Sequence, residues 1–203
     1  MPLFEDGNPN IEYGEIRYKS LLALISAMPG RIFLYNGEEL GLPQATVPVE
    51  DRQDPAFFRQ PPDSDYQGRD GCRVPLPWDH QGDYAGFSDN APWLPMPDYW
   101  SELSVSKQVV DLRSMLNFYK KILKLRKENS WMRSSKLIDL VCHDDVLFFT
   151  KISDEICVHA CMNFGNSEKG LPLKEVVLRT SDRPLSDQLI APGEIVFARN
   201  KAI

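Results

Sequence analysis

Residues 29–39 read PGRIFLYNGEE and join a helix stop, a short apolar run and a turn rich in carboxylates. The pair Pro29-Gly30 is typical of the end of a helix. The run at 32–35 is β-prone and apolar on both faces, as in a strand of a parallel sheet. The sequence therefore predicts an α/β unit in which the turn after the buried strand carries Glu38 and Glu39. This turn lies at the C-terminal end of the strand, the edge of the sheet where such proteins bind ligands.

Helical periodicity flanks this unit on both sides. Before it, apolar residues recur at helical spacing and predict an amphipathic helix over residues 14–28. After it, a second helix is predicted over residues 112–127, with Asp111 near its start and lysines in its far half, as the helix dipole prefers. Residues 1–13 have the composition of a surface lead-in without a folded element.

Between these helices, residues 42–100 carry most of the 16 prolines and no helical pattern. A structureless loop rarely exceeds about 15 residues, so this segment is either disordered or functional. Its many aromatic residues argue against disorder. We interpret it as an ordered excursion over the mouth of an active site.

The centre of that excursion is GRDGCRVPLPW, residues 68–78. This stretch combines the bidentate hydrogen-bonding groups of Arg69 and Asp70 with a rigid aromatic residue, a surface that suits sugars or phosphates. Arg73, Trp78 and the upstream Glu38 are predicted to shape the loop. Two interpretations of Asp70 stay open: a ligand contact, or an ion-pair partner of Arg69 or Arg73 that fixes the loop.

The last third changes to short β-prone runs separated by turn residues. The predicted strands are 137–142, 146–152, 156–162, 176–180 and 194–199, with turns at Asp144-Asp145 and Ser153-Asp154. We therefore expect a small antiparallel domain over residues 132–203, after an α/β part over residues 1–131.

Composition limits the possible partners. The chain has 203 residues, a net charge of −6 and 42% hydrophobic residues, which indicates a packed core and argues against nucleic acid or an anionic membrane as partner. No apolar run is long enough to span a bilayer, and residues 1–6 lack the features of a secretory signal. The four cysteines show no disulfide framework, so we expect free thiols and a cytoplasmic location.

Other residues and motifs that could carry chemistry give no strong signal for a metal or cofactor site. Cys157, His159 and Cys161 alternate along one predicted strand and share a face, but a closed zinc site needs a fourth ligand, and we expect core-facing cysteines with no metal. No nucleophile-elbow, phosphate-loop or zinc-protease motif occurs, and no cofactor is expected.

The motifs at 30–42 and 68–78, their order and the loop between them resemble the C-terminal part of an α-glucosidase of the α-amylase superfamily, glycoside hydrolase family 13, in its oligo-1,6-glucosidase and maltase branch. The resemblance implies a C-terminal slice of a (β/α)8 barrel, comprising the last helices, strand eight and its long loop, followed by an antiparallel β-sandwich. One departure is Gly30-Arg31-Ile32, where the family has Gly-Thr-Pro.

This resemblance also implies a function. The chain is expected to be a fragment of a retaining enzyme that removes terminal α-linked glucose from maltose-like or isomaltose-like oligosaccharides, with Arg69 holding the terminal glucose. The family's three catalytic carboxylates lie upstream and are absent here, so the partner is the missing N-terminal barrel portion and the isolated chain is expected to be inactive. A non-catalytic scaffold or carbohydrate-binding relic stays open, as do linkage preference and oligomeric state.

Overall fold

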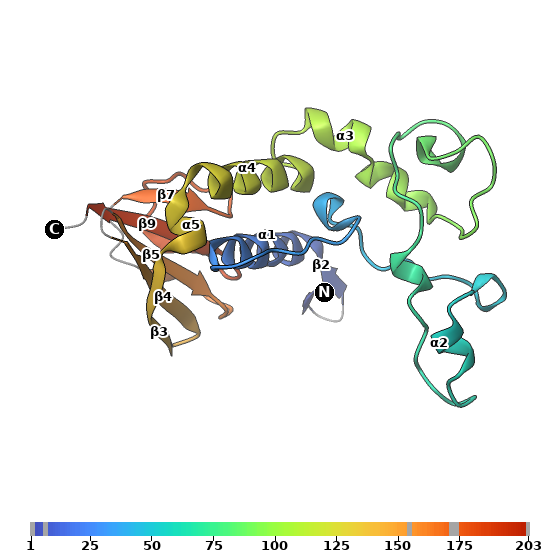
Figure 1. Ribbon diagram of the computed structural model, residues 1–203, viewed down its shortest axis with the longest axis horizontal. Coiled ribbons are helices and arrows are strands. Elements are labelled where there is room, and N and C mark those ends of the chain that lie inside the picture. The colour runs from blue at the N-terminus through green and yellow to red at the C-terminus, as the bar shows by residue number, and fades with distance from the viewer. Residues whose placement is uncertain (1–2, 6–7, 154–155, 171–174, 202–203) are drawn as a thin grey trace. The chain divides into compact units, whose positions relative to one another are not determined.

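The computed structural model describes residues 3–5, 8–153, 156–170 and 175–201, and the chain divides into two compact units (Figure 1). The sheet unit comprises Met1–Phe33 and Tyr119–Ile203, and the loop unit comprises Leu34–Phe118. Each unit has its own hydrophobic core. This division groups residues that contact one another within this chain. The expected boundary at residue 131 separates a barrel part from an antiparallel domain, and that boundary stays a prediction.

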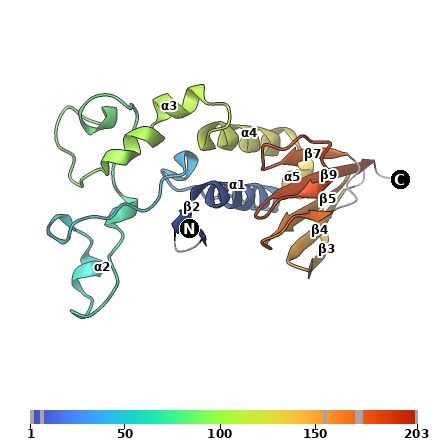
Figure 2. The ribbon, with the colours of Figure 1, turned by 180° about the vertical axis from the view of Figure 1, so that it is seen from behind.

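The antiparallel sheet expected in the last third is present in the sheet unit (Figure 2). Its strands are hydrogen-bonded in the order β3-β4-β5-β9-β7. Their bounds are β3 (Lys136–His143), β4 (Val146–Ile152), β5 (Ile156–Asn163), β9 (Ile195–Lys201) and β7 (Val176–Arg179). The short strands β6 (Lys169–Gly170) and β8 (Leu189–Ile190) form a separate antiparallel pair.

The β3–β4 hairpin turns at the predicted dipeptide. Asp144 and Asp145 both have positive φ, 47° and 63°, as a tight two-residue hairpin turn requires. Aspartate tolerates this left-handed conformation better than most residues. The other predicted turn, at Ser153-Asp154, lies partly outside the described residues.

One face of the sheet packs aromatic side chains against a helical segment. Phe149 of β4 and Phe197 of β9 are almost fully buried, with ring centroids 6.2 Å apart. Trp131 of α5 (Ser130–Ser134) lies 5.9 Å from Phe197, centroid to centroid. Alternation along the strands puts Val158 and Ala160 of β5 on this same buried face.

The predicted first helix is α1 (Ile11–Ala27), which begins three residues before the predicted start. Its buried Ser20 contacts the sheet: the hydroxyl accepts a 3.0 Å hydrogen bond from the backbone N–H of Ile195 and lies 2.7 Å from the Thr180 hydroxyl. A polar residue on the buried face is therefore fully bonded, as burial demands.

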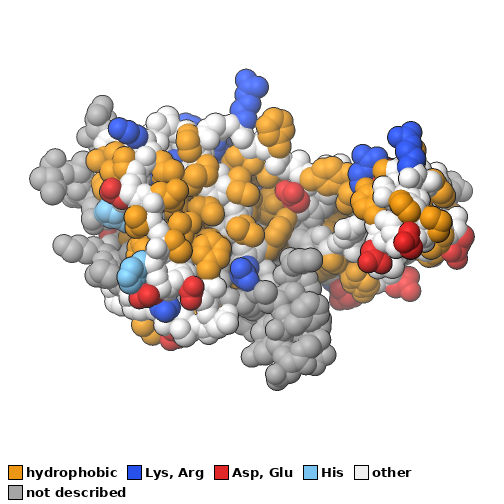
Figure 3. Space-filling model, turned by 90° about the horizontal axis from the view of Figure 1, so that it is seen from below, with side chains coloured by type: hydrophobic (Ala, Val, Ile, Leu, Met, Phe, Trp, Pro, Cys, Tyr) orange, Lys and Arg blue, Asp and Glu red, His pale blue; other side chains and the backbone are white. Residues whose placement is uncertain are grey.

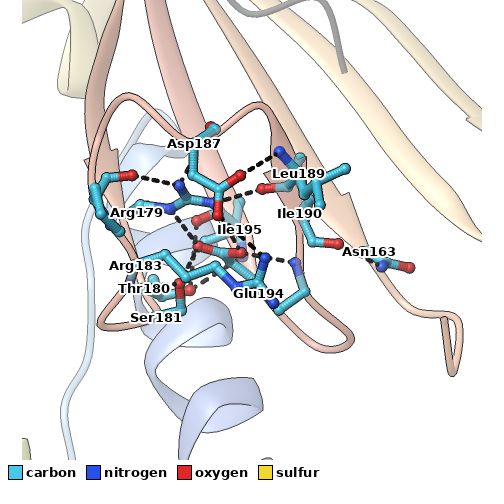
Figure 4. A network of polar contacts seen from close by, with 12 residues as sticks. Asn163, Arg179, Thr180, Ser181, Arg183, Asp187, Leu189, Ile190, Glu194 and Ile195 are labelled. Carbon is cyan, nitrogen blue, oxygen red and sulfur yellow. Dashed lines mark hydrogen bonds and ion pairs between the residues drawn. The ribbon is translucent and has the colours of Figure 1, made fainter. Parts of the chain in front are cut away.

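The same region holds a buried ion pair (Figure 4). Arg179 and Glu194 have side-chain exposures of 2% and 0%, and the Nε of Arg179 donates to Oε1 of Glu194 over 2.7 Å. Glu194 also accepts from the Ser181 hydroxyl and the Ala191 backbone N–H. With so many donors the buried carboxylate is compensated, so the network serves the packing of β7 and β9.

The C-terminal end of α1 is held by two buried cations. Arg126 of α4 (Met115–Glu128) donates through Nη1 to the carbonyls of Ser26 and Met28, over 2.6 and 2.9 Å. Lys151 of β4 donates to the carbonyl of Ala27. These are carbonyls that a helix end leaves without intrahelical partners, and the helix dipole favours positive charge there.

The loop unit is ordered around its own core, although it contains few regular elements. Buried Ala45, Val47, Val74, Leu94 and Trp100 form that core, with Leu42, Met96 and Leu103 packed against it. The helical turns are η1 (Glu38–Leu40), η2 (Val49–Asp51), α2 (Pro55–Phe58), η3 (Asp70–Cys72), η4 (Asp83–Gly86), η5 (Asp98–Leu103) and α3 (Val105–Val110). The segment that we expected to be ordered thus packs around a hydrophobic core of its own.

In the loop unit, hydrogen bonds from a side-chain amide to the backbone connect segments that no β-ladder joins. Gln108 donates through Nε2 to the carbonyls of Leu40 and Leu103, over 2.9 and 2.8 Å, and its Oε1 accepts from the N–H of Leu116. The second predicted helix is α4, which begins at Met115. Leu112 therefore lies outside it and is 88% exposed.

The buried parallel strand predicted over residues 32–35 is not formed. These residues have no regular structure, Phe33 is 89% exposed and Tyr35 is 52% exposed. A parallel strand is stabilised by hydrogen bonds to neighbours, and no strand among the described residues pairs with this run. The lead-in interpretation was also wrong, because β1 (Leu3–Glu5) pairs with β2 (Asn8–Asn10).

Hydrophobic side chains gather on one face of the sheet unit, shown in Figure 3. Large exposed apolar residues of this unit include Leu21 and Ile25 of α1, 44% and 50% exposed, and Leu140 and Val141 of β3. The cysteines at 72, 142, 157 and 161 are free thiols. No helix of the described ranges has the length and apolarity needed to cross a membrane.

Lys151 predicts a pH-dependent stability. Burial, and then the charge of Arg126, lowers its pKa from 10.5 to about 8. Between those values the unfolded state binds more protons, so the free energy of unfolding should rise with pH, by about 3 kcal/mol in total. Urea unfolding from pH 7 to 11 should show this rise in the parent and lose it in Lys151→Met. The exposed Lys120→Met is the matched control, and an unchanged slope in Lys151→Met would contradict the assignment.

Exposed apolar side chains predict self-association of the isolated chain. We expect concentration-dependent sedimentation and binding of a hydrophobic dye, both reduced in the double variant Leu21→Gln/Ile25→Gln. A monomer with a sharp, cooperative thermal transition and no dye binding would show that the apolar face is tolerated in water.

Candidate functional site

The site is built on a tight backbone at residues 68–73 of the loop unit. Gly68 has φ +79°, a left-handed conformation that suits glycine. At Gly71 the backbone approaches a neighbouring segment so closely that a Cβ atom would lie 2.2 Å from the Ala45 carbonyl oxygen. The Ala45 N–H also donates to the Gly71 carbonyl over 2.9 Å, so the glycines fix the path of the loop.

Arg69 is held by a buried aspartate. Its Nε and Nη2 donate to Oδ2 and Oδ1 of Asp54 over 2.9 and 2.7 Å, and its backbone N–H donates to Oδ2 over 2.8 Å. The Asp54 side chain is fully buried, whereas that of Arg69 is 55% exposed. The guanidinium fork that we expected to bind a ligand therefore binds a protein carboxylate, and Nη1 has no partner among the described contacts.

This pairing also fixes the charge state of Asp54. Hydrogen bonds from Arg69 hold the pKa of the Asp54 carboxyl well below its usual range, and the backbone N–H of Ala56 lowers it further. The same pair raises the pKa of Arg69. Both groups therefore stay ionised at any pH at which a folded protein works.

Asp70 lies beneath this pair. It is 0% exposed, and its Oδ2 accepts the backbone N–H groups of Gln53 and Asp54 over 2.7 and 2.8 Å. Of the two interpretations of Asp70, this geometry favours the one in which it fixes the loop. The ligand contact of Asp70 stays an untested prediction.

Arg73 stands between the two buried carboxylates. Its Nη1 lies 3.8 Å from Oδ1 of Asp54 and 3.8 Å from Oδ1 of Asp70, and the side chain is 32% exposed. These distances are too long for hydrogen bonds, and Oδ1 of Asp70 is buried without a hydrogen-bond partner in the described part of the chain. Arg73 thus compensates charge across the cluster.

Two of the predicted loop-shaping residues, Trp78 and Glu38, form backbone hydrogen bonds in turns of the loop unit. Trp78 donates its N–H to the Ala85 carbonyl over 2.8 Å and accepts at its own carbonyl from the N–H of Ser106 over 3.0 Å, while its side chain is 52% exposed. Glu38 begins η1, and its carbonyl accepts from the Gly41 N–H. Both residues hold turns of the loop unit together.

An open, polar pocket of about 460 Å³ adjoins the Gly68 end of the cluster. It is lined by Gln44, Ala45, Thr46, Asp65, Tyr66, Gln67 and Gly68. Amide, hydroxyl and phenol groups of this kind can hydrogen-bond a neutral polyol. The sequence did not single out Asp54 from the other carboxylates of the loop, since its local signal is one aspartate before a proline, an ordinary start for a short helix.

The cysteine–histidine strand shows ordinary packing. The Sγ of Cys157 lies 3.6 Å from Nε2 of His159, and Nδ1 of His159 lies 3.1 Å from the Thr150 hydroxyl. Burial raises the pKa of the Cys161 thiol to about 12. Across the described residues, no three of the histidine, cysteine and acidic side chains come together as a metal site.

Comparison with known proteins gives the chain a family. The family described as alpha amylase, catalytic domain, matches residues 5–135. A probable alpha-glucosidase of Rhizobium meliloti is 32% identical over 78% of this chain and 28% of its own length. Maltase A1 of Drosophila melanogaster is 31% identical over 79% of this chain and 28% of its own length.

Solved structures agree with this assignment. The alpha-glucosyl transfer enzyme XgtA is 31% identical and superposes with a TM-score of 0.76 over 91% of this chain and 36% of its own. An isomaltulose synthase of Erwinia rhapontici, 20% identical, shares the fold with a TM-score of 0.79 over 97% of this chain and 40% of its own. The chain spans about a third of the length of these proteins, and it belongs to the α-amylase family of glycoside hydrolases.

Proposed function

We propose that this chain is the C-terminal part of a retaining α-glucosidase that hydrolyses terminal α-linked glucose from short oligosaccharides. Relatives described as alpha-glucosidase, maltase and oligo-1,6-glucosidase support that reaction class. The observation that carries the proposal is the half-exposed guanidinium of Arg69 on a rigid support of buried carboxylates. A fixed cationic donor of this type can recognise sugar hydroxyls.

The exposed run at 32–35 supports the idea that the chain completes a larger body. Its β-prone residues lie in water, with Phe33 89% exposed. In the proposed enzyme this run is the eighth strand of a (β/α)8 barrel, α1 is the seventh helix, and α4 is the last helix. The partner is then the N-terminal barrel portion, which supplies the neighbouring strands and buries the run.

The carboxylates of the loop are not arranged for hydrolysis. Asp54 and Asp70 accept hydrogen bonds from Arg69 and from backbone N–H groups. Glycoside hydrolysis needs two carboxyl groups across the scissile bond, one of them able to give a proton. We place the nucleophile, the acid/base residue and the stabilising aspartate in the N-terminal portion, and the recognition of terminal glucose in this chain.

Within this enzyme, Arg69 contacts the non-reducing glucose through Nη1, because Nε and Nη2 are bonded to Asp54. Arg73 is the alternative donor, since its contacts with the carboxylates are longer. We place the enzyme in the cytoplasm and give it oligosaccharide substrates. A non-catalytic carbohydrate-binding role is the second candidate, favoured by the bonded state of the loop carboxylates.

The isolated chain should not hydrolyse glucosides. Incubation with p-nitrophenyl α-glucoside should release no more nitrophenol than a heat-treated sample, because no paired acid and nucleophile is present in the loop. Turnover clearly above that background would place catalytic carboxylates within this chain and overturn the division of roles.

Arg69→Lys tests the sugar contact in an enzyme that carries this chain. Lysine keeps the charge but has neither the Nη1 donor nor the fork that Asp54 holds in place, so kcat/KM should fall about 30-fold or more, while the cation that remains beside Asp54 lets the fold survive. Arg73→Lys measured in parallel identifies which guanidinium reaches the sugar. If Arg69→Lys stays within about threefold of the parent, Arg69 only anchors the loop and the contact belongs elsewhere.

A further inference from the structure

Asp54 is buried at the point where the loop unit presents Arg69. Four donors converge on its two oxygens: the backbone N–H, Nε and Nη2 of Arg69, and the backbone N–H of Ala56. The carboxylate therefore fixes both ends of the arginine, its main chain and its guanidinium plane. A half-exposed arginine without such a partner would sample many rotamers.

A second carboxylate fixes the first. Oδ2 of Asp70 accepts the backbone N–H groups of Gln53 and Asp54, so the main chain that carries Asp54 is itself bonded from below. Gly68 packs against the same side chain, because a Cβ atom at Gly68 would lie 3.3 Å from the Cβ of Asp54. The order of contacts is Asp70, the backbone at 53–54, Asp54 and then Arg69.

We propose that Asp54 is a positioning residue for substrate recognition, which sets the guanidinium plane of Arg69 before the sugar arrives. The inference rests on the proposed function, in which Arg69 contacts the terminal glucose. Because the arginine is ordered in the free protein, binding does not have to pay the entropy of ordering it, and its Nη1 edge is held ready for a hydroxyl. Asp54 itself is too deeply buried to touch a sugar.

The two roles of Asp54 can be separated by mutation. As the N-cap of α2 it accepts the Ala56 N–H, a task that asparagine and serine also perform well. Neither replacement offers a charged, two-oxygen acceptor to the fork of Arg69. Asp54→Asn and Asp54→Ser should therefore keep the helix cap and release the guanidinium, with the exposed Asp51→Asn as matched control.

Kinetics in an enzyme that carries this chain test the positioning role. Asp54→Asn should lower kcat/KM for a glucoside at least tenfold, and the double variant with Arg69→Lys should be no worse than Arg69→Lys alone, since both changes act on one contact. A multiplied loss in the double variant would overturn the proposal, as would Asp54→Asn activity within threefold of the parent when Arg69→Lys is impaired. If Arg69→Lys is itself unimpaired, the proposed sugar contact has failed and the positioning role falls with it.

A second measurement uses the chain as it is and does not depend on activity. In 15N-labelled parent protein, the Nε–H of Arg69 should exchange with water at least tenfold more slowly than that of the exposed Arg59. Asp54→Ser should abolish this difference if that variant folds, and the parent comparison stands alone if it does not. Equal exchange at Arg69 and Arg59 in the parent would show that the fork is not fixed, whatever the fate of the proposed function.

Discussion

The sheet unit depends on one buried guanidinium. Arg126 donates to the carbonyl of Ser26 in the last turn of α1 and to those of Met28 and Gly30 just after it. It also donates to the carbonyl of Met132 in α5. One side chain thus joins the end of α1 to α4 and α5. Its charge is balanced by carbonyl dipoles at a helix C-terminus, where positive charge is favourable. Burial lowers the pKa of this arginine, but a guanidinium starts so high that it stays charged.

In the loop unit the buried charges are negative, and they bind N–H groups where Arg126 binds carbonyls. Asp54 and Asp70 are buried carboxylates, and they are compensated by Arg69, Arg73 and backbone N–H groups. A segment without ladders must pair its polar groups one by one, and buried aspartates can each accept several N–H groups. These contacts give the proline-rich excursion a defined path and hold the guanidinium of Arg69 against Asp54.

In the proposed enzyme, this chain recognises the terminal glucose and the N-terminal portion carries out hydrolysis. The guanidinium that we propose for recognition is bonded to Asp54, and the pKa of that carboxyl is held well below its usual range. Hydrolysis needs carboxyl groups free to attack or to give a proton. The apolar, β-prone run at 32–35 is largely exposed in this chain, and in the proposed enzyme neighbouring strands bury it.

Local pattern alone was enough for the helices α1 and α4, the antiparallel strands and the Asp144-Asp145 turn, because periodicity and turn chemistry are properties of neighbouring residues. It also identified the motifs of the family, whereas the ligand role of Arg69 stays a prediction. It misjudged residues 32–35, because a strand needs hydrogen-bonding partners that no local pattern supplies. The contact between Asp54 and Arg69 could not be predicted for the same reason, because the two residues lie 15 positions apart in the sequence. Which groups a buried carboxylate bonds is decided by the path of the folded chain, since hydrogen bonds act over about 3 Å regardless of distance along the sequence.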